Sequence, residues 1–176
     1  MRKLLFALVA STIAISPATA ALKVGDKAPD FTTTGAVGGK EFKIHLADQL
    51  RKGPVVLYFF PKAFTSGCTA EAHAFSESIG DFKKAGAQVI GMSGDNLKTL
   101  HEFSSKECRS AFPVATATPE IQKEFDVAWA AHPGITTRTS YVIGKDGKIV
   151  WAKAPFNAQA QVGYDSLAAA VAAAKK

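Results

Sequence analysis

Cysteine is scarce in this chain, which has only Cys68 and Cys108 among its 176 residues. Two thiols are too few for a disulfide-rich secreted scaffold, and too few for a metal site built from four cysteines. The two cysteines therefore act either as one pair or as two separate thiols.

Long runs of basic residues are also absent. The formal net charge is +6 and the isoelectric point is near 9.3. However, no basic run is longer than two residues, and no basic stripe alternates with aromatic residues. Proteins that bind nucleic acid concentrate their positive charge in such patterns. We therefore expect no nucleic-acid partner.

The composition lacks the bias of a disordered or fibrous chain. Hydrophobic residues make up 47% of the sequence and charged residues 20%, with 14 glycines and 8 prolines. These proportions exclude a collagen-like chain and a low-complexity linker. The sequence shows neither an internal repeat nor a linker, and its length fits one domain with a sizeable core.

A hydrophobic run long enough to cross a membrane is missing too. Residues 4–15 form an uncharged apolar stretch that is shorter than the ~20 residues of a membrane helix. The stretch follows Arg2 and Lys3 and is succeeded by small residues, which is typical of a secretory signal peptide. We predict a signal peptide at 1–20 and a single domain at 21–176. The mature protein would then be exported, to the periplasm of a bacterium, and would have no membrane contact.

Segments rich in β-branched and aromatic residues alternate with helical patterns along the rest of the chain. This order predicts an α/β protein with a thioredoxin-like fold, in which helices flank a mixed central sheet and a β-hairpin comes first. The expected hairpins are 31–34 with 41–44, around a glycine-rich turn, and 139–143 with 149–153; the expected buried strands are 55–60 and 89–92; the expected helices are 68–82, 97–107 and 165–174.

The turn after the buried strand 55–60 concentrates the reactive residue types. Ligands bind at the carboxyl ends of the strands in an open α/β sheet. If Thr65 caps the next helix, Cys68 lies in its first turn, where unpaired N–H groups and the helix dipole favour a thiolate over a thiol. Cys68 is therefore a candidate nucleophile. It also shares a helical face with Phe75 and Phe82, so a purely structural role in the core stays open.

The spacing of Pro61, Thr65 and Cys68, P-x-x-x-T-x-x-C, resembles the active-site loop of the peroxiredoxins. The subfamily that it resembles most is peroxiredoxin Q, also called bacterioferritin comigratory protein, within the AhpC/TSA superfamily. The likeness extends to 24–31, VGDKAPDF, and to 138–143, RTSYVI, and covers most of residues 22–153. The stretch 128–137 fits the family poorly.

This resemblance implies a thiol peroxidase that reduces hydrogen peroxide and organic hydroperoxides. Cys68 would be the peroxidatic cysteine, which becomes a sulfenic acid. Pro61 would shield its sulfur from water, and the Thr65 hydroxyl would hold the peroxide while steering the thiolate. Arg138 would stabilise the thiolate and the charge on the leaving oxygen, and Glu71 would orient the guanidinium.

The resemblance also implies how the enzyme is recycled. Some members of the subfamily carry a resolving cysteine on the second long helix, and Cys108 lies about one turn beyond that place. We expect Cys108 to capture the oxidised Cys68 in a disulfide, and a thioredoxin-like dithiol protein to reduce it. Turnover through a mixed disulfide with an external thiol is the alternative. No cofactor or metal is expected, and the protein would be a monomer or a weak dimer.

Other uses of the two thiols remain as alternatives. A metal site could combine Cys68 with His73, but Met92 and Cys108 do not complete a ligand set by their spacing. A thioredoxin-type oxidoreductase needs Cys-x-x-Cys, and Thr65 stands where the first cysteine would be. A non-enzymatic binding or structural module with a static Cys68–Cys108 disulfide is the remaining alternative.

Overall fold

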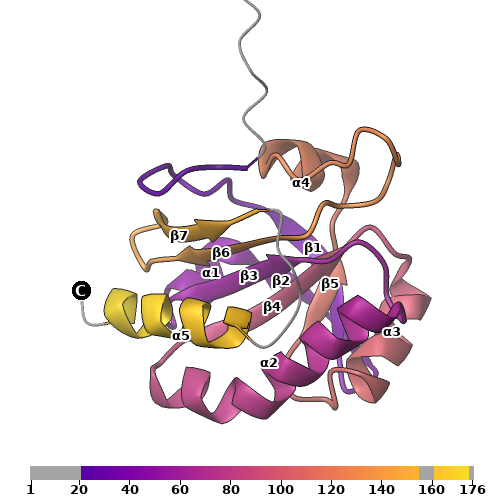
Figure 1. The fold of residues 1–176 in the computed structure, drawn as a ribbon, viewed down its shortest axis with the longest axis horizontal. Coiled ribbons are helices and arrows are strands. Elements are labelled where there is room, and N and C mark those ends of the chain that lie inside the picture. The colour runs from indigo at the N-terminus through magenta and orange to yellow at the C-terminus, as the bar shows by residue number, and fades with distance from the viewer. Residues whose placement is uncertain (1–20, 155–160, 175–176) are drawn as a thin grey trace, which may run out of the picture.

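The computed structural model describes residues 21–154 and 161–174. Its centre is one seven-stranded sheet in the order β2-β1-β5-β4-β3-β6-β7, with helices on both faces (Figure 1). The elements in chain order are β1 (Thr32–Val37), β2 (Lys40–His45), α1 (Leu46–Leu50), β3 (Val55–Phe59), α2 (Ser66–Lys84), β4 (Gln88–Ser93), α3 (Leu97–Lys106), β5 (Val114–Thr116), α4 (Pro119–Glu124), β6 (Thr139–Ile143), β7 (Ile149–Lys153) and α5 (Gln161–Ala174).

The predicted signal peptide, 1–20, lies outside the described residues. Within 21–154 and 161–174, no helix is both long enough and apolar enough to cross a membrane.

The central strand β3 explains why the sheet is mixed and covered on both faces. It runs parallel to β4 and antiparallel to β6, and all of its residues are buried. Its side chains alternate between two cores: Tyr58 points toward α2 and α3, whereas Leu57 and Phe59 point toward α1 and α4. The predicted mixed sheet between helices is confirmed.

The predicted N-terminal hairpin is also confirmed, with a shorter turn than expected. β1 and β2 pair as far as Val37 and Lys40, and the turn consists of Gly38 and Gly39 at φ angles of +54° and +74°. Gly35, which was expected in the turn, belongs to β1. A Cβ atom there would lie 2.7 Å from the Val114 carbonyl oxygen of β5, so the close pairing of β1 with β5 requires glycine.

Three short elements were not predicted, namely α1, β5 and α4. Each has six residues or fewer, too few to show a helical or strand periodicity. β5 nevertheless completes the sheet, because it pairs with β4 on one side and with β1 on the other.

Candidate functional site

The loop that follows β3 leads directly into α2 and carries the predicted motif. Thr65 is the N-cap of α2, as expected, with extended backbone angles. Its hydroxyl donates to the Lys62 carbonyl oxygen at 2.9 Å, a hydrogen bond between two residues of the same loop. Cys68 is the third residue of the helix and so belongs to its first turn, whose N–H groups have no partner within the helix. Pro61 is half-buried at the start of this loop.

Arg138 reaches the same place from β6. Because Phe59 of β3 pairs with Thr139, the first residue of β6, Arg138 directly before that strand lies beside the loop that leaves β3. The Arg138 Nη2 atom donates to Cys68 Sγ at 3.1 Å, and Nη1 donates to the Glu71 carboxylate. Cys68 is 1% exposed, and the Arg138 side chain is 16% exposed. A buried sulfur therefore faces one permanent positive charge that water screens poorly.

Glu71 lies one turn after Cys68 and is 1% exposed. Burial raises the pKa of its carboxyl to about 7, although Arg138 acts in the opposite direction. Its Oε1 atom is buried without a hydrogen-bond partner in the part of the chain that the structure describes. The predicted pairing of Glu71 with Arg138 is present. Glu71 and Cys68 each accept a hydrogen bond from one of the two terminal nitrogens of the same guanidinium.

Asp95, which was not singled out from the sequence, holds the loop in place. It follows β4 and its carboxylate is buried. One oxygen accepts from the Ala63 N–H at 2.7 Å and from the Ser93 hydroxyl at 2.9 Å; the other pairs with Lys62 Nζ at 3.0 Å. The only hint in the sequence is its position directly after a buried strand, where an α/β sheet places functional groups.

We expect Asp95→Ala to slow the oxidation of Cys68 by hydrogen peroxide by about tenfold, because the Ala63 N–H loses its acceptor and the loop is held less firmly. Stopped-flow oxidation of the reduced protein measures this rate. Lys62→Met is the matched control: it removes the ion pair of an exposed lysine and keeps the Ala63 bond, so its rate should stay close to wild type. Equal rates for all three proteins would remove Asp95 from the positioning of the loop.

The loop also exposes an aromatic residue in an unusual backbone conformation. Phe64 has a φ angle of +62° and is 44% exposed. Its ring meets the edge of Phe103 of α3, with ring centroids 5.3 Å apart. The loop between β3 and α2 is thus in contact with the helix that leads to Cys108.

Cys108 is fully buried just beyond the end of α3. Burial and the neighbouring Glu107 raise the pKa of its thiol far above the usual range. Both Cys68 and Cys108 are free thiols, so the static disulfide of the alternative interpretation is not present.

The imidazole of His73, considered above as a partner of Cys68 in a metal site, pairs with Glu107: Nε2 lies 2.9 Å from Oε2. Among residues 21–154 and 161–174, no group of three His, Cys, Asp or Glu side chains is arranged to hold a metal ion.

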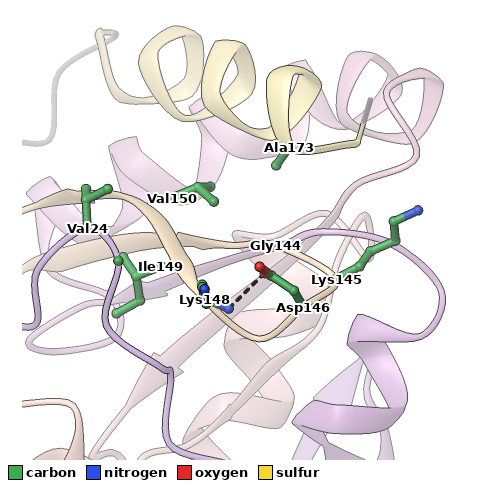
Figure 2. A pocket seen from close by; sticks show the side chains of 9 residues that line it. Val24, Gly144, Lys145, Asp146, Lys148, Ile149, Val150 and Ala173 are labelled. Carbon is green, nitrogen blue, oxygen red and sulfur yellow. Dashed lines mark hydrogen bonds between the residues drawn. The ribbon is translucent and has the colours of Figure 1, made fainter. Parts of the chain in front are cut away.

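A hollow of about 580 Å³ lies away from the cysteines (Figure 2). It is formed by the turn between β6 and β7, by Val24 and by Ala173 of α5. In this turn the Asp146 carboxylate accepts from the Lys148 N–H at 3.0 Å. Because the turn follows Ile143, it lies at the end of β6 opposite to Arg138, so the hollow takes no part in the chemistry of Cys68.

The comparisons with known proteins agree on one family. Residues 24–152 match the sequence pattern described as "AhpC/TSA family". A Mycobacterium tuberculosis protein named as a peroxiredoxin is 37% identical over 144 residues, which covers 77% of this chain and 87% of that protein. Peroxiredoxin Bcp of Escherichia coli K12 is 33% identical over 135 residues, which covers 73% of this chain and 83% of Bcp.

A solved structure shows the same fold. The peroxidoxin BcpB of Mycobacterium tuberculosis superposes with a TM-score of 0.77 at 27% identity, and the match covers 86% of this chain and 97% of BcpB.

Proposed function

This chain belongs to the AhpC/TSA family of peroxiredoxins, and from this premise we propose that Cys68 is its peroxidatic cysteine. Peroxiredoxins are thiol-dependent peroxidases, and the chain is an oxidoreductase of this class. The observation that carries the assignment to Cys68 is the contact of its sulfur with Arg138, at the start of a helix and at the carboxyl end of β3. Among residues 21–154 and 161–174 no cation is found beside the Cys108 thiol, and burial and Glu107 raise its pKa, which favours the neutral form.

The reaction at Cys68 transfers one oxygen atom. The thiolate attacks a peroxide oxygen, so that an S–O bond forms and the O–O bond breaks. Two electrons pass from sulfur to the peroxide, and the departing alkoxide or hydroxide takes up a proton to leave as an alcohol or as water. The sulfur becomes a sulfenic acid. Arg138 stabilises the thiolate before the attack and the negative oxygen during it.

The other residues of the loop act on geometry and solvation. The Thr65 hydroxyl is exposed at the N-cap, where it is free to exchange its bond with Lys62 for one with the peroxide. Pro61 offers no N–H group, which keeps a competing donor away from the sulfur. Glu71 holds the second arm of the Arg138 guanidinium and fixes its plane.

The decisive experiment follows the reduced protein after mixing with hydrogen peroxide or a small alkyl hydroperoxide. Fast loss of one thiol, mapped to Cys68 by alkylation and mass spectrometry, supports the proposal. Oxidation at the rate of free cysteine, or oxidation of Cys108 first, would overturn it.

Cys108 is the proposed resolving cysteine. Its thiolate attacks the sulfenic sulfur of Cys68, so that an S–S bond forms and the S–O bond breaks; the departing hydroxide takes up a proton and leaves as water. The two thiols are buried and unlinked, and burial keeps the Cys108 pKa high. The chain must therefore open locally before this step, which exposes the thiol and returns its pKa toward the usual range. A thioredoxin-like dithiol protein then reduces the disulfide.

We expect Cys108→Ser to keep the fast first oxidation of Cys68 and to lose turnover with a dithiol protein, because the sulfenic acid has no internal partner. Small thiols would still support turnover. Steady-state assays with both kinds of reductant measure the difference. Normal turnover of Cys108→Ser with the dithiol protein, together with no Cys68–Cys108 disulfide in oxidised wild type, would establish the one-cysteine mechanism instead.

We also infer that the protein is exported to a bacterial periplasm as a monomer or a weak dimer, with cleavage before Ala21. Two features at Ala21 support this cleavage. Its backbone nitrogen donates to Asp126 Oδ2 at 3.1 Å, so cleavage would place a terminal ammonium beside a carboxylate. Its φ angle is +101°, which is unfavourable for alanine within a chain. A first residue has no φ angle, so cleavage removes this strain.

We expect Asp126→Asn to lower the melting temperature of the processed protein by about 2 °C, as for an exposed ion pair. An α-ammonium loses its proton near pH 8. A carboxylate partner raises the pKa of the α-ammonium in the folded state. The difference in melting temperature between wild type and Asp126→Asn should therefore be present below about pH 8 and be lost at higher pH. Asp146→Asn is an exposed control away from Ala21. A mature chain that does not begin at Ala21, by intact mass, would contradict the cleavage site.

A further inference from the structure

The segment after α3 carries Cys108 next to a strained stretch of backbone. α3 ends at Lys106, and the φ angles of Arg109 and Ser110 are +50° and +57°. Neither residue is a glycine, so both occupy the left-handed region at an energetic cost. Two such residues in a row favour any rearrangement that lets the backbone leave this conformation.

Buried aromatic residues hold the segment at both ends. Phe103 stacks on Phe60 with ring centroids 5.2 Å apart, and Phe112 meets the edge of Tyr58 at 5.9 Å. Between these anchors the backbone is held by a few bonds, such as Cys108 N–H to the Phe103 carbonyl oxygen at 3.0 Å. Residues 104–111 are thus a short unit that can open while its two ends stay in the core.

Two contacts hold this unit against α2. His73 and Glu107 pair through Nε2 and Oε2 at 2.9 Å, and both side chains are partly shielded from water. The single hydrogen of the Ser76 hydroxyl is shared between two acceptors, the Ala72 carbonyl oxygen at 2.8 Å and the Cys108 carbonyl oxygen at 3.0 Å, so it links α2 to the residue that has to move. Partly buried contacts of this kind stabilise more than exposed ones do.

We propose that His73 and Ser76 are positioning residues for disulfide formation: they hold the Cys108 segment closed on α2, against the backbone strain at Arg109 and Ser110, and so set the rate at which Cys108 reaches the oxidised Cys68. The proposal rests on the proposed role of Cys108 as the resolving cysteine. The step itself is the attack of Cys108 on the sulfenic sulfur, with water leaving.

Helix α2 couples the release of the two cysteines. Cys68 lies in its first turn, and His73 and Ser76 lie on the following two turns. Unwinding that extends from the start of α2 through these two turns exposes Cys68 and also withdraws the partners that hold the Cys108 segment. One opening event frees both sulfurs, and while the segment is closed, Cys68 keeps the geometry that it needs to react with peroxide.

A third contact provides a matched control. Glu77 and Arg109 form an ion pair at 3.3 Å between the same two elements, but both side chains are at least half exposed. An exposed pair at this distance contributes little, because water screens it. Glu77→Gln removes this charge from α2 and should leave the opening of the segment unchanged.

The test compares His73→Ala, Ser76→Ala, Ser110→Gly and Glu77→Gln with wild type after a single addition of hydrogen peroxide. Rapid quenching with acid and alkylation gives the rate of the first oxidation and the rate of Cys68–Cys108 disulfide formation. Hydrogen exchange of the peptide 103–112 in the reduced protein reports opening without any redox step. Glu107→Gln replaces His73→Ala if the latter does not fold.

We expect equal first oxidation in all the proteins. Disulfide formation should be about fivefold faster in His73→Ala and Ser76→Ala, and about threefold slower in Ser110→Gly, where glycine accepts the positive φ angle. Hydrogen exchange at 103–112 should be faster than in wild type in His73→Ala and Ser76→Ala, and slower in Ser110→Gly. If the disulfide forms at one rate in every variant and exchange does not change, the positioning role is wrong. A different outcome is that wild type forms no Cys68–Cys108 disulfide, although hydrogen exchange at 103–112 still differs among the variants as expected. In that case the proposed resolving role of Cys108 is wrong, and the opening of the segment does not control disulfide formation.

Discussion

Cys68→Ser is expected to abolish peroxide reduction. A serine hydroxyl is a poor nucleophile unless a base removes its proton. The polar group that contacts the Cys68 sulfur is the Arg138 guanidinium, which is already protonated, and the unpaired N–H groups of a helix start can only donate. Stopped-flow mixing of the variant with hydrogen peroxide should show only the slow, uncatalysed reaction of the remaining thiol.

Cys108→Ser is the control for this experiment, because it removes the other thiol and should oxidise as fast as wild type in the first step. Residual fast peroxide consumption by Cys68→Ser would place the chemistry at another residue.

Arg138→Ala should leave a slow enzyme, with the second-order rate constant for peroxide reduced by about 10²–10³, the usual loss for one charge-stabilising donor. Arg138→Lys tests the geometry: a lysine keeps the charge but has no planar fork, so it cannot donate to Cys68 and Glu71 as the guanidinium does. We expect an intermediate rate for it. An Arg138→Ala protein with wild-type kinetics would remove this residue from the site.

The same variant has a pH signature through Glu71. The pKa of Glu71 is about 7 in the folded protein, above the usual value for a glutamate. Burial of this carboxyl therefore costs no stability at low pH and destabilises the fold as the pH rises through 7. Arg138 opposes this rise in the pKa. Without it the pKa moves higher, and Arg138→Ala should lose more melting temperature at pH 8 than at pH 5. A uniform loss at both values would mean that Glu71 is not the group concerned.

The residues that could be predicted from the sequence are those fixed by a local pattern. Thr65 and Cys68 were placed correctly at the start of a helix, because a capping residue between an apolar run and a helical periodicity defines that boundary. Arg138 lies 70 residues farther on, and nothing in its own surroundings distinguishes it from a surface arginine. Only the family resemblance indicated that Arg138 belongs to the site. In the structure, the pairing of β3 with β6 places it there.

What the sequence could not give are the contacts that depend on the path of the chain. In the sequence Asp95 looks like a residue of an ordinary turn. The pairing of β4 with β3 brings its carboxylate to the loop between β3 and α2, where it accepts from the Ala63 N–H. The pairing of His73 with Glu107 likewise depends on how the end of α3 packs on α2. Such tertiary contacts carry no periodicity, so they become visible only in three dimensions.

The position of β5 has a consequence for the order in which the chain folds. β1 is joined to the rest of the sheet through β5, with Gly35 opposite Ala115, and these residues are far apart in the sequence. Pairings between distant segments form slowly, because the loop between them must close first. Until they form, the core that surrounds Cys68 and Cys108 lacks the fixed contribution of Val114 from β5. While β5 is unpaired, a chain that folds under oxidising conditions has its two thiols less well shielded, so folding competes with premature oxidation of Cys68 and Cys108.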